Sequence, residues 1–161
     1  MKALIVVDMQ NDFITGALAV PGAKNLIKPI ADKVREAKKA GWLVIYSMDW
    51  HPISHVSYDI NGGSWPIHCL QDSWGAKIPR ELVEALQDVK AYEILKGTYS
   101  EQEQYSAYTP DMEKVLIENY VSAIEVCGLA AEYCVKETIA DLRNDGYWVR
   151  PLNDLIGKLN V

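Results

Sequence analysis

Residues 122–138, SAIEVCGLAAEYCVKET, contain the pattern that decides the fold: a strand, a turn and a helix in succession. Residues 123–126 form a short apolar run, a Cys-Gly pair at 127–128 interrupts it, and from Ala131 apolar residues recur at helical spacing. Cys134 is therefore expected in the first turn of a helix, where unpaired N–H groups and the helix dipole favour a thiolate and could bind an oxyanion. We interpret Cys134 as a candidate acyl-transfer nucleophile; the alternative is a small core residue.

Strand-like runs alternate with amphipathic helical segments along the whole chain. The predicted strands cover residues 3–7, 42–48, 92–95, 123–126 and 147–152, and the predicted helices cover residues 25–40, 81–86, 111–119 and 131–144. This alternation predicts an α/β fold with right-handed crossovers and a doubly wound, mostly parallel sheet. Because Pro151 would disrupt a central strand, we expect the last strand at an edge. The length predicts a single domain over residues 1–161.

Four residues with charged or reactive side chains follow the predicted strands: Asp8, Asp49, Lys96 and, after the turn, Cys134. Doubly wound sheets bind ligands beyond the carboxyl ends of their strands, so these groups are expected at one rim. There Asp8 could accept the thiol proton if burial raises its pKa, and Lys96 could hold the thiolate and orient Asp8. Singly, each of these residues is also compatible with a surface charge or a cap.

All three histidines, His51, His55 and His68, lie in the long connection of residues 50–79, shortly after Asp49. Asp49 and His51 project to the same side of an extended segment, and His68 can fold back across the loop. Imidazole and carboxylate suit Zn²⁺, Fe²⁺ or Mn²⁺, and three protein ligands with open positions are typical of a catalytic site. The alternative is that the histidines only decorate a surface loop.

Charge and cysteine content limit the function classes. The formal net charge of −6 argues against nucleic acid or an anionic membrane as the main partner. The three cysteines cannot all pair internally, and no disulfide framework is indicated. The apolar run near the N-terminus is too short for a signal sequence or a membrane span. We therefore expect a reducing, cytoplasmic compartment.

Several aromatic residues occur near these candidate positions in the chain. A flat aromatic substrate could stack among them, although about half of them are expected to fill the core. They are Phe13, Trp50, Trp65, Tyr99, Tyr105 and Tyr133.

Six stretches in register make the chain resemble the isochorismatase-like cysteine hydrolases, and within them the nicotinamidase/pyrazinamidase group. They are VVDMQNDF (6–13), DWHPISHVSY (49–58), WPIHCLQDSWGA (65–76), KGT (96–98), YSAY (105–108) and CGLAAEYCVKET (127–138). Together they cover nearly the whole chain in a consistent order, which is far more specific than any one of them. The resemblance implies a three-layer, Rossmann-like fold.

The resemblance also implies roles for the reactive residues. Cys134 would be the nucleophile, Asp8 the general base and acid, and Lys96 their electrostatic partner. The peptide bond between Leu129 and Ala130 would be cis, which would turn the Ala130 N–H toward the oxyanion alongside the N–H of Cys134.

The implied metal ligands are Asp49, His51 and His68, with zinc as the expected ion and iron or manganese as alternatives. The resemblance leaves the role of His55 open, as a further ligand or as a residue that orients a ligand. The positions implied to line the substrate pocket are Phe13, Trp65 and Tyr105.

The implied reaction converts nicotinamide, or analogues such as pyrazinamide, to the acid and ammonia through a thioester on Cys134. Two alternatives stay open: hydrolysis of another amide or ureido compound, and a non-catalytic binding module. Proteins of the family continue past the fifth strand into another helix and a sixth strand. We expect the sixth strand to be missing here, which would leave residues 147–152 as an exposed edge that invites pairing into a homo-oligomer.

Overall fold

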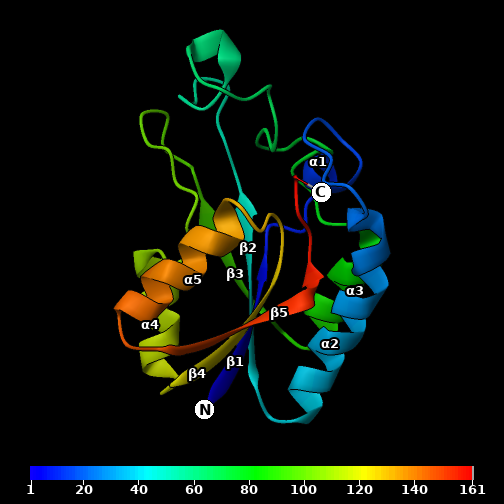
Figure 1. Ribbon diagram of the computed structural model, residues 1–161, viewed down its shortest axis with the longest axis vertical. Coiled ribbons are helices and arrows are strands. Elements are labelled where there is room, and N and C mark those ends of the chain that lie inside the picture. Colours follow the sequence, from blue (N-terminus) through cyan, green and yellow to red (C-terminus); the bar gives the residue numbers. More distant parts are fainter. Residues whose placement is uncertain (161) are drawn as a thin grey trace.

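The computed structural model describes residues 1–160 and contains one twisted sheet with helices on both faces (Figure 1). Its strands are β1 (Lys2–Val7), β2 (Leu43–Asp49), β3 (Tyr92–Lys96), β4 (Ala123–Gly128) and β5 (Trp148–Ile156). Its α-helices are α1 (Asn11–Ile14), α2 (Ile27–Lys39), α3 (Arg80–Asp88), α4 (Pro110–Glu118) and α5 (Cys134–Asn144). Two short 3₁₀ helices are η1 (Ala23–Leu26) and η2 (Asp59–Asn61).

The five strands are parallel throughout and follow the order β3-β2-β1-β4-β5. Helices α2 and α3 cover one face of the sheet, and α4 and α5 cover the other (Figure 1). The doubly wound α/β fold predicted from the sequence is therefore confirmed. Within residues 1–160, no helix combines the length and apolar character needed to cross a membrane.

The central strand explains why the sheet forms in this way. The aliphatic run that follows Lys2 in β1 is almost completely buried, because helices cover it on both faces. On α2 the buried residues recur at helical spacing and face the sheet, while most of its charged residues are exposed. The buried residues of α2 are Ile30, Ala31, Val34 and Ala37.

The last strand lies at an edge, as Pro151 indicated, and pairs only with β4 among the described strands. It runs further than predicted, to Ile156, and the register shifts between Val126 and Gly128 of β4. Helix α5 begins at Cys134 and not at Ala131. This difference matters for the site, because the three residues before Cys134 form a turn, and Cys134 is the first residue of the helix.

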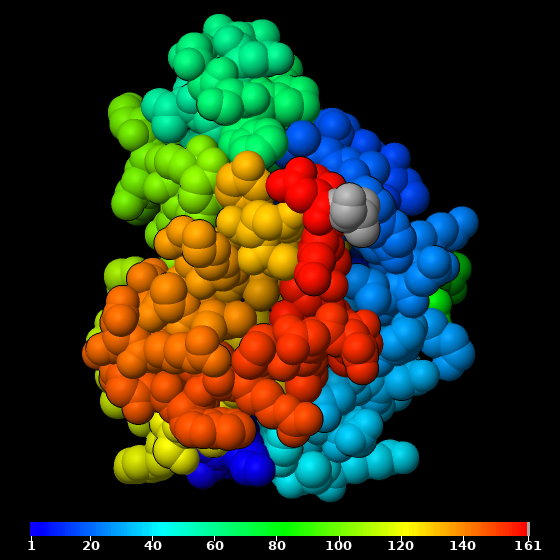
Figure 2. All heavy atoms as spheres, in the orientation of Figure 1, coloured from blue at the N-terminus to red at the C-terminus, as the bar shows by residue number. Residues whose placement is uncertain are grey.

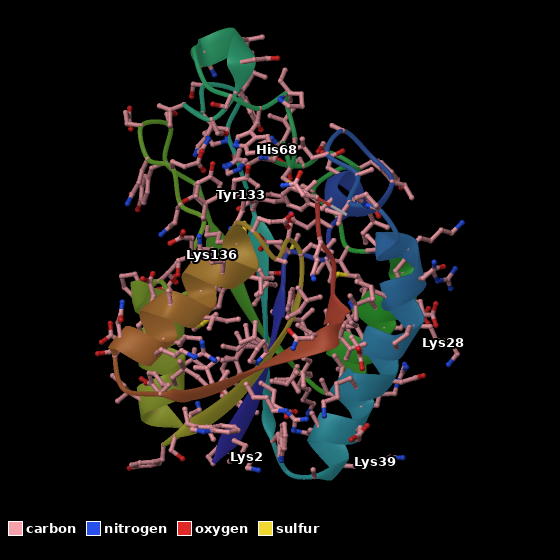
Figure 3. All side chains as sticks on the ribbon, viewed as in Figure 1. Lys2, Lys28, Lys39, His68, Tyr133 and Lys136 are labelled. Carbon is pink, nitrogen blue, oxygen red and sulfur yellow. The ribbon has the colours of Figure 1, made fainter. Side chains whose placement is uncertain are left out.

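The carboxyl ends of the strands all point toward the end of the molecule that carries the long connection between β2 and α3 (Figure 1). The N-terminus lies at the opposite end of the sheet. Figure 3 shows His68 and Tyr133 above the carboxyl ends of the strands, whereas Lys2 and Lys39 mark the other end. The predicted site residues therefore gather at one rim.

Candidate active site and metal centre

Lys96 is the centre of the site, and its ammonium group is completely buried. Its Nζ lies 2.7 Å from Asp49 Oδ1, 3.0 Å from Asp8 Oδ2 and 3.4 Å from Cys134 Sγ. It also donates a hydrogen bond of 3.2 Å to the carbonyl oxygen of Gln104. Four strands thus bring one cation, two carboxylates and one thiol into direct contact. Burial alone would lower the pKa of Lys96, but its two carboxylate neighbours raise it well above the usual value, so the ammonium stays charged.

Asp8 is suited to accept a proton. Its backbone lies in the left-handed region at φ 48°, directly after β1, and its side chain is fully buried. Ser47 Oγ donates a hydrogen bond of 2.7 Å to Oδ1, whereas Oδ2 has no aligned hydrogen-bond donor within residues 1–160. Burial raises the pKa of Asp8, although Lys96 opposes the shift, as the sequence required of a general base.

Cys134 lies within reach of this base. The ligand atoms of Asp8, Asp49 and Cys134 are all within 4.8 Å of one another. Burial raises the pKa of the Cys134 thiol well above its usual value; Lys96 opposes this, and the two carboxylates add to it. The expected resting thiolate is therefore not favoured here, because loss of solvation outweighs the effects of the helix N-terminus and of Lys96. The arrangement suits a thiol that loses its proton to Asp8 as it attacks.

The turn before α5 presents two backbone donors beside this thiol. The bond between Leu129 and Ala130 is cis, as the resemblance implied. In the described part of the chain, no hydrogen bond uses the N–H of Ala130 or that of Cys134, which is the first residue of α5. Both groups are thus free to donate to an oxyanion.

Asp49, His51 and His68 bring their ligand atoms within 4.8 Å of one another, and all three side chains are buried. Nδ1 of His51 lies 2.7 Å from the carbonyl oxygen of Gly97, and Nδ1 of His68 lies 2.8 Å from that of Pro66. Because a carbonyl only accepts, each Nδ1 donates, and each Nε2 is left to bind a metal.

The fit to a divalent cation rests on the environment of these donors. His51 Nε2 is buried, lies 3.5 Å from Asp49 Oδ2, and makes no hydrogen bond within residues 1–160. Burial lowers the pKa of His68, which favours the neutral ring that a metal requires. Burial would raise the pKa of Asp49, but Lys96 and His51 hold it well below its usual range, so the carboxylate is charged. Two imidazoles and one carboxylate then suit zinc, iron or manganese.

Both ring nitrogens of His55 are engaged in hydrogen bonds, so neither is free to bind a metal. Its Nε2 donates a hydrogen bond of 2.9 Å to the carbonyl oxygen of Gln102, and its Nδ1 lies 2.7 Å from Ser57 Oγ and accepts from the Ser57 N–H. Its ring stacks on that of His51 with centroids 4.0 Å apart. Of the two roles left open by the sequence, the structure favours the second.

A pocket with about 460 Å³ of empty space opens beside these groups and is lined by Asp49, His68 and Cys134. The predicted lining positions Phe13, Trp65 and Tyr105 all contribute to it, and so does Tyr133. The other aromatic candidates, Trp50 and Tyr99, are not part of its lining. Trp65 Nε1 donates a hydrogen bond of 3.0 Å to Tyr105 Oη and packs edge-on against Tyr133. The pocket is therefore lined by aromatic and aliphatic side chains and ends at the Cys134 thiol, Asp49 and His68.

Comparison with known proteins shows the family of this chain. A family model described as Isochorismatase domain matches residues 2–161. The chain belongs to the isochorismatase family. It is 31% identical to the nicotinamidase of Saccharomyces cerevisiae over 96% of this chain and 90% of the relative. It is 34% identical to the nicotinamidase/pyrazinamidase of Mycobacterium tuberculosis over 96% of this chain and 86% of the relative.

Solved structures of isochorismatase-family proteins agree with the fold. The pyrazinamidase of Pyrococcus horikoshii in complex with zinc superimposes with a TM-score of 0.89 at 37% identity, covering 99% of this chain and 87% of that one. The yeast nicotinamidase bound to the inhibitor nicotinaldehyde superimposes with a TM-score of 0.92 at 30% identity, covering 99% and 89%. The resemblance to the nicotinamidase/pyrazinamidase group is thus confirmed.

Sequence reasoning missed Gln10, whose side chain binds the backbone of Asp49, one of the candidate metal ligands of this isochorismatase-family site. Its Nε2 donates to the carbonyl oxygens of Asp49 (2.7 Å) and Ala76 (3.0 Å), and its Oε1 accepts from the Asp49 N–H at 2.8 Å. Gln10 is completely buried, so all of these bonds count toward positioning Asp49. The only signal in the sequence was its place two residues after Asp8.

Asp12 was also missed. Its Oδ2 accepts a hydrogen bond of 2.8 Å from the N–H of Cys69, whose backbone lies in the left-handed region at φ 48°. The Cys69 carbonyl oxygen in turn accepts from the His51 N–H at 3.0 Å. The backbone of Cys69 therefore connects Asp12 to His51 within the loop that carries the histidines, and its thiol is buried.

Proposed function

We propose that this protein is a nicotinamidase that hydrolyses nicotinamide to nicotinate and ammonia through a thioester on Cys134, with zinc as the bound metal. The observation that carries the proposal is the position of Lys96, whose Nζ contacts Asp8, Cys134 and Asp49 at once. One ammonium group thereby joins the nucleophile and its base to the metal-ligand cluster, beside one aromatic pocket.

The names of the relatives support this choice of substrate and metal. Proteins named nicotinamidase match almost the whole chain. Zinc is bound in the structure of the Pyrococcus relative, and nicotinaldehyde, in which an aldehyde replaces the amide, is bound in the yeast structure. Two imidazoles and one carboxylate are also a common zinc ligand set.

The steps follow from the geometry of the chain's own residues. Asp8 Oδ2 takes the proton from Cys134 Sγ as the sulfur attacks the amide carbon, and the free N–H groups of Ala130 and Cys134 stabilise the oxyanion. Asp8 then returns the proton to the leaving ammonia and removes one from the water that hydrolyses the thioester. Lys96 stays charged and compensates the negative charge that moves between Asp8 and the sulfur. When bound, the metal supplies an open coordination position for a pyridine nitrogen, which orients the amide.

The pocket favours an uncharged aromatic amide. Its lining is mostly aromatic and aliphatic, and the described residues that form it include no lysine and no arginine. A ureido acid or another anionic substrate would need a cation to compensate its carboxylate. We therefore do not favour hydrolysis of such a compound.

The experiment that tests the proposal is ammonia release from nicotinamide by zinc-loaded protein. Wild type is expected to release ammonia, and Cys134→Ala is expected to lose this activity while it binds zinc with unchanged stoichiometry. Benzamide, which lacks the ring nitrogen, is the control substrate and should react far more slowly. Ammonia release by Cys134→Ala at the wild-type rate would refute the thioester route, and an inactive zinc-loaded wild type would refute the function.

Three further expectations stay proposals: a cytoplasmic location, one domain over residues 1–161, and a homo-oligomer formed through the edge at β5. The structure offers only the edge itself, since β5 pairs on one side among the described strands. Sedimentation of the purified protein would test the last of them.

A further inference from the structure

One wall of the pocket comes from a segment far from the predicted site in sequence. Leu159, three residues after the end of β5, lines the pocket together with Leu18, Val20 and Leu129. Val20 and Leu129 belong to one core cluster, and Leu159 packs against it. The pocket therefore has an aliphatic side in addition to its aromatic one, and Leu159 is the last residue that contributes to it.

The backbone around Leu159 is fastened to the turn that carries the oxyanion donors. Glu132 Oε1 accepts a hydrogen bond of 3.0 Å from the Leu159 N–H, and Oε2 accepts one of 2.7 Å from the Asn160 N–H. The Ala131 N–H donates to the Gly157 carbonyl oxygen at 2.8 Å, and the Gly157 N–H donates to that of Gly128 at 3.1 Å. Figure 2 shows the C-terminal segment, in red, directly beside this turn.

Gly157 lies in close contact with the Leu129 side chain. A Cβ there would lie 2.4 Å from a methyl carbon of Leu129, so glycine lets the segment lie against the turn. The two carboxylate oxygens of Glu132 then hold the next two N–H groups in place. These bonds hold the side chain of Leu159 at the pocket. Apart from them, Gly157 is the only residue among 157–160 that makes backbone hydrogen bonds to the turn.

We propose that Leu159 is a specificity-determining residue that limits the size of the aromatic ring accepted by the pocket, and that Glu132 is the positioning residue that holds Leu159 there. The inference rests on the proposed function, because it concerns the ring of the same substrate. Leu159→Ala removes three side-chain carbons, which is more than the space that one added methyl group needs, and a methyl group in an apolar pocket changes discrimination by about 10- to 200-fold.

The test compares nicotinamide with its 4-, 5- and 6-methyl derivatives in zinc-loaded protein. In Leu159→Ala, the ratio of kcat/KM for at least one methyl derivative to that for nicotinamide is expected to rise about tenfold or more. The ratio is taken within each protein, so a general change in activity cancels and only a change in discrimination remains. Leu155→Ala is the matched control, since Leu155 packs against the same core cluster but does not line the pocket.

The positioning role of Glu132 is tested by asking whether its effect on the kcat/KM ratio requires Leu159. Glu132→Ala should shift the same ratio in the same direction, Glu132→Gln less, and Glu137→Ala, on the exposed side of α5, not at all. In the double variant Glu132→Ala/Leu159→Ala the ratio should equal that of Leu159→Ala alone, because a residue that acts through another adds nothing once the other is gone. Additive effects would overturn the positioning role.

Equal ratios for Leu159→Ala and Leu155→Ala would overturn the specificity role. Calorimetric binding of the same four amides, measured in the Cys134→Ala background, gives the selectivity without turnover. If zinc-loaded wild type released no ammonia, the proposed function would fail, and the binding ratios would still decide for or against Leu159.

Discussion

Two clusters that each combine a lysine with carboxylates lie on the same sheet, and their surroundings differ. At the carboxyl ends of the strands, Lys96 contacts Asp8 and Asp49, and none of the three side chains is more than 7% exposed. On the face covered by α2, Lys33 Nζ lies 3.1 Å from Glu125 Oε1, with 19% and 10% of the two side chains exposed. The residue types are alike, so the difference lies in the burial.

The second cluster is also stabilised from its exposed side. Arg150 approaches Glu125 Oε2 at 3.4 Å with 64% of its side chain exposed, and Lys33 lies 5.1 Å from the ring centroid of Trp42. Water and an aromatic face thus share the charge of these groups. In the Lys96 cluster the charges balance one another and bind polar groups, Ser47 Oγ and the Gln104 carbonyl oxygen. The comparison teaches that a cluster of a lysine and carboxylates acquires shifted pKa values where water is almost completely excluded.

The largest expected effect separates the two clusters by activity. Asp8→Asn should lower kcat/KM for nicotinamide by about 10³-fold or more, because it removes the proton acceptor. Glu125→Gln, the matched change in the other cluster, should leave kcat/KM within about twofold. The measurement is ammonia release at equal zinc content. A comparable loss in both variants would show that the two clusters do not differ in function.

The second-largest expected effect is a difference in stability between the Lys96 cluster and the Lys33 cluster. Lys96→Met leaves two buried carboxylates without their cation and should cost about 3–5 kcal/mol of unfolding free energy. Lys33→Met should cost less, since Arg150 stays 3.4 Å from Glu125 Oε2. Urea denaturation of the metal-free proteins at neutral pH measures both. Equal costs would break the comparison.

The pH dependence gives a smaller but more specific signal. Because burial raises the pKa of Asp8 above 3.8, ionising it costs free energy in the folded state. The stability contribution of Asp8 should therefore fall as the pH rises from about 4 through its folded-state pKa, and Asp8→Asn should lack this fall. Over the same window kcat/KM should rise with pH, as the base becomes ionised. Metal-free denaturation curves and a pH–rate profile measure the two trends, and Glu125→Gln should keep both.

The smallest expected effect is the response to salt. The cost of Lys33→Met should shrink between about 0.1 M and 1 M NaCl, because solvent ions screen partly exposed pairs. The cost of Lys96→Met should change little, since its partners are almost completely buried. The same urea titrations at two salt concentrations measure this. A strong salt response of Lys96→Met would show that water does enter the site.

Much of the site followed from the sequence because strand ends are easy to locate. The aliphatic run before Asp8 and the run before Asp49 predicted their positions at one rim, and the structure places both side chains on Lys96. The spacing of Asp49, His51 and His68 likewise predicted a cluster that the structure brings together. Local patterns were sufficient here, since parallel strands deliver their last residues to a common edge.

The sequence did not predict the protonation state of Cys134 or the roles of Gln10 and Leu159. A helix N-terminus alone favours a thiolate, but burial by residues from other elements raises the pKa of Cys134. Gln10 binds the backbone N–H of Asp49, and Glu132 binds that of Leu159, across loops that return from distant parts of the chain. No spacing in the sequence specifies which N–H or carbonyl a side chain will meet.

The sequence by itself determined the alternation of strands and helices and the identity of the side chain at the end of each strand. Hydrophobic periodicity is a local property, and it can be read without knowing what lies opposite. Only the tertiary structure decided how completely water is excluded from those side chains, and therefore which of them carry charge. Desolvation depends on every element packed around a group, so it exists only once the chain has folded.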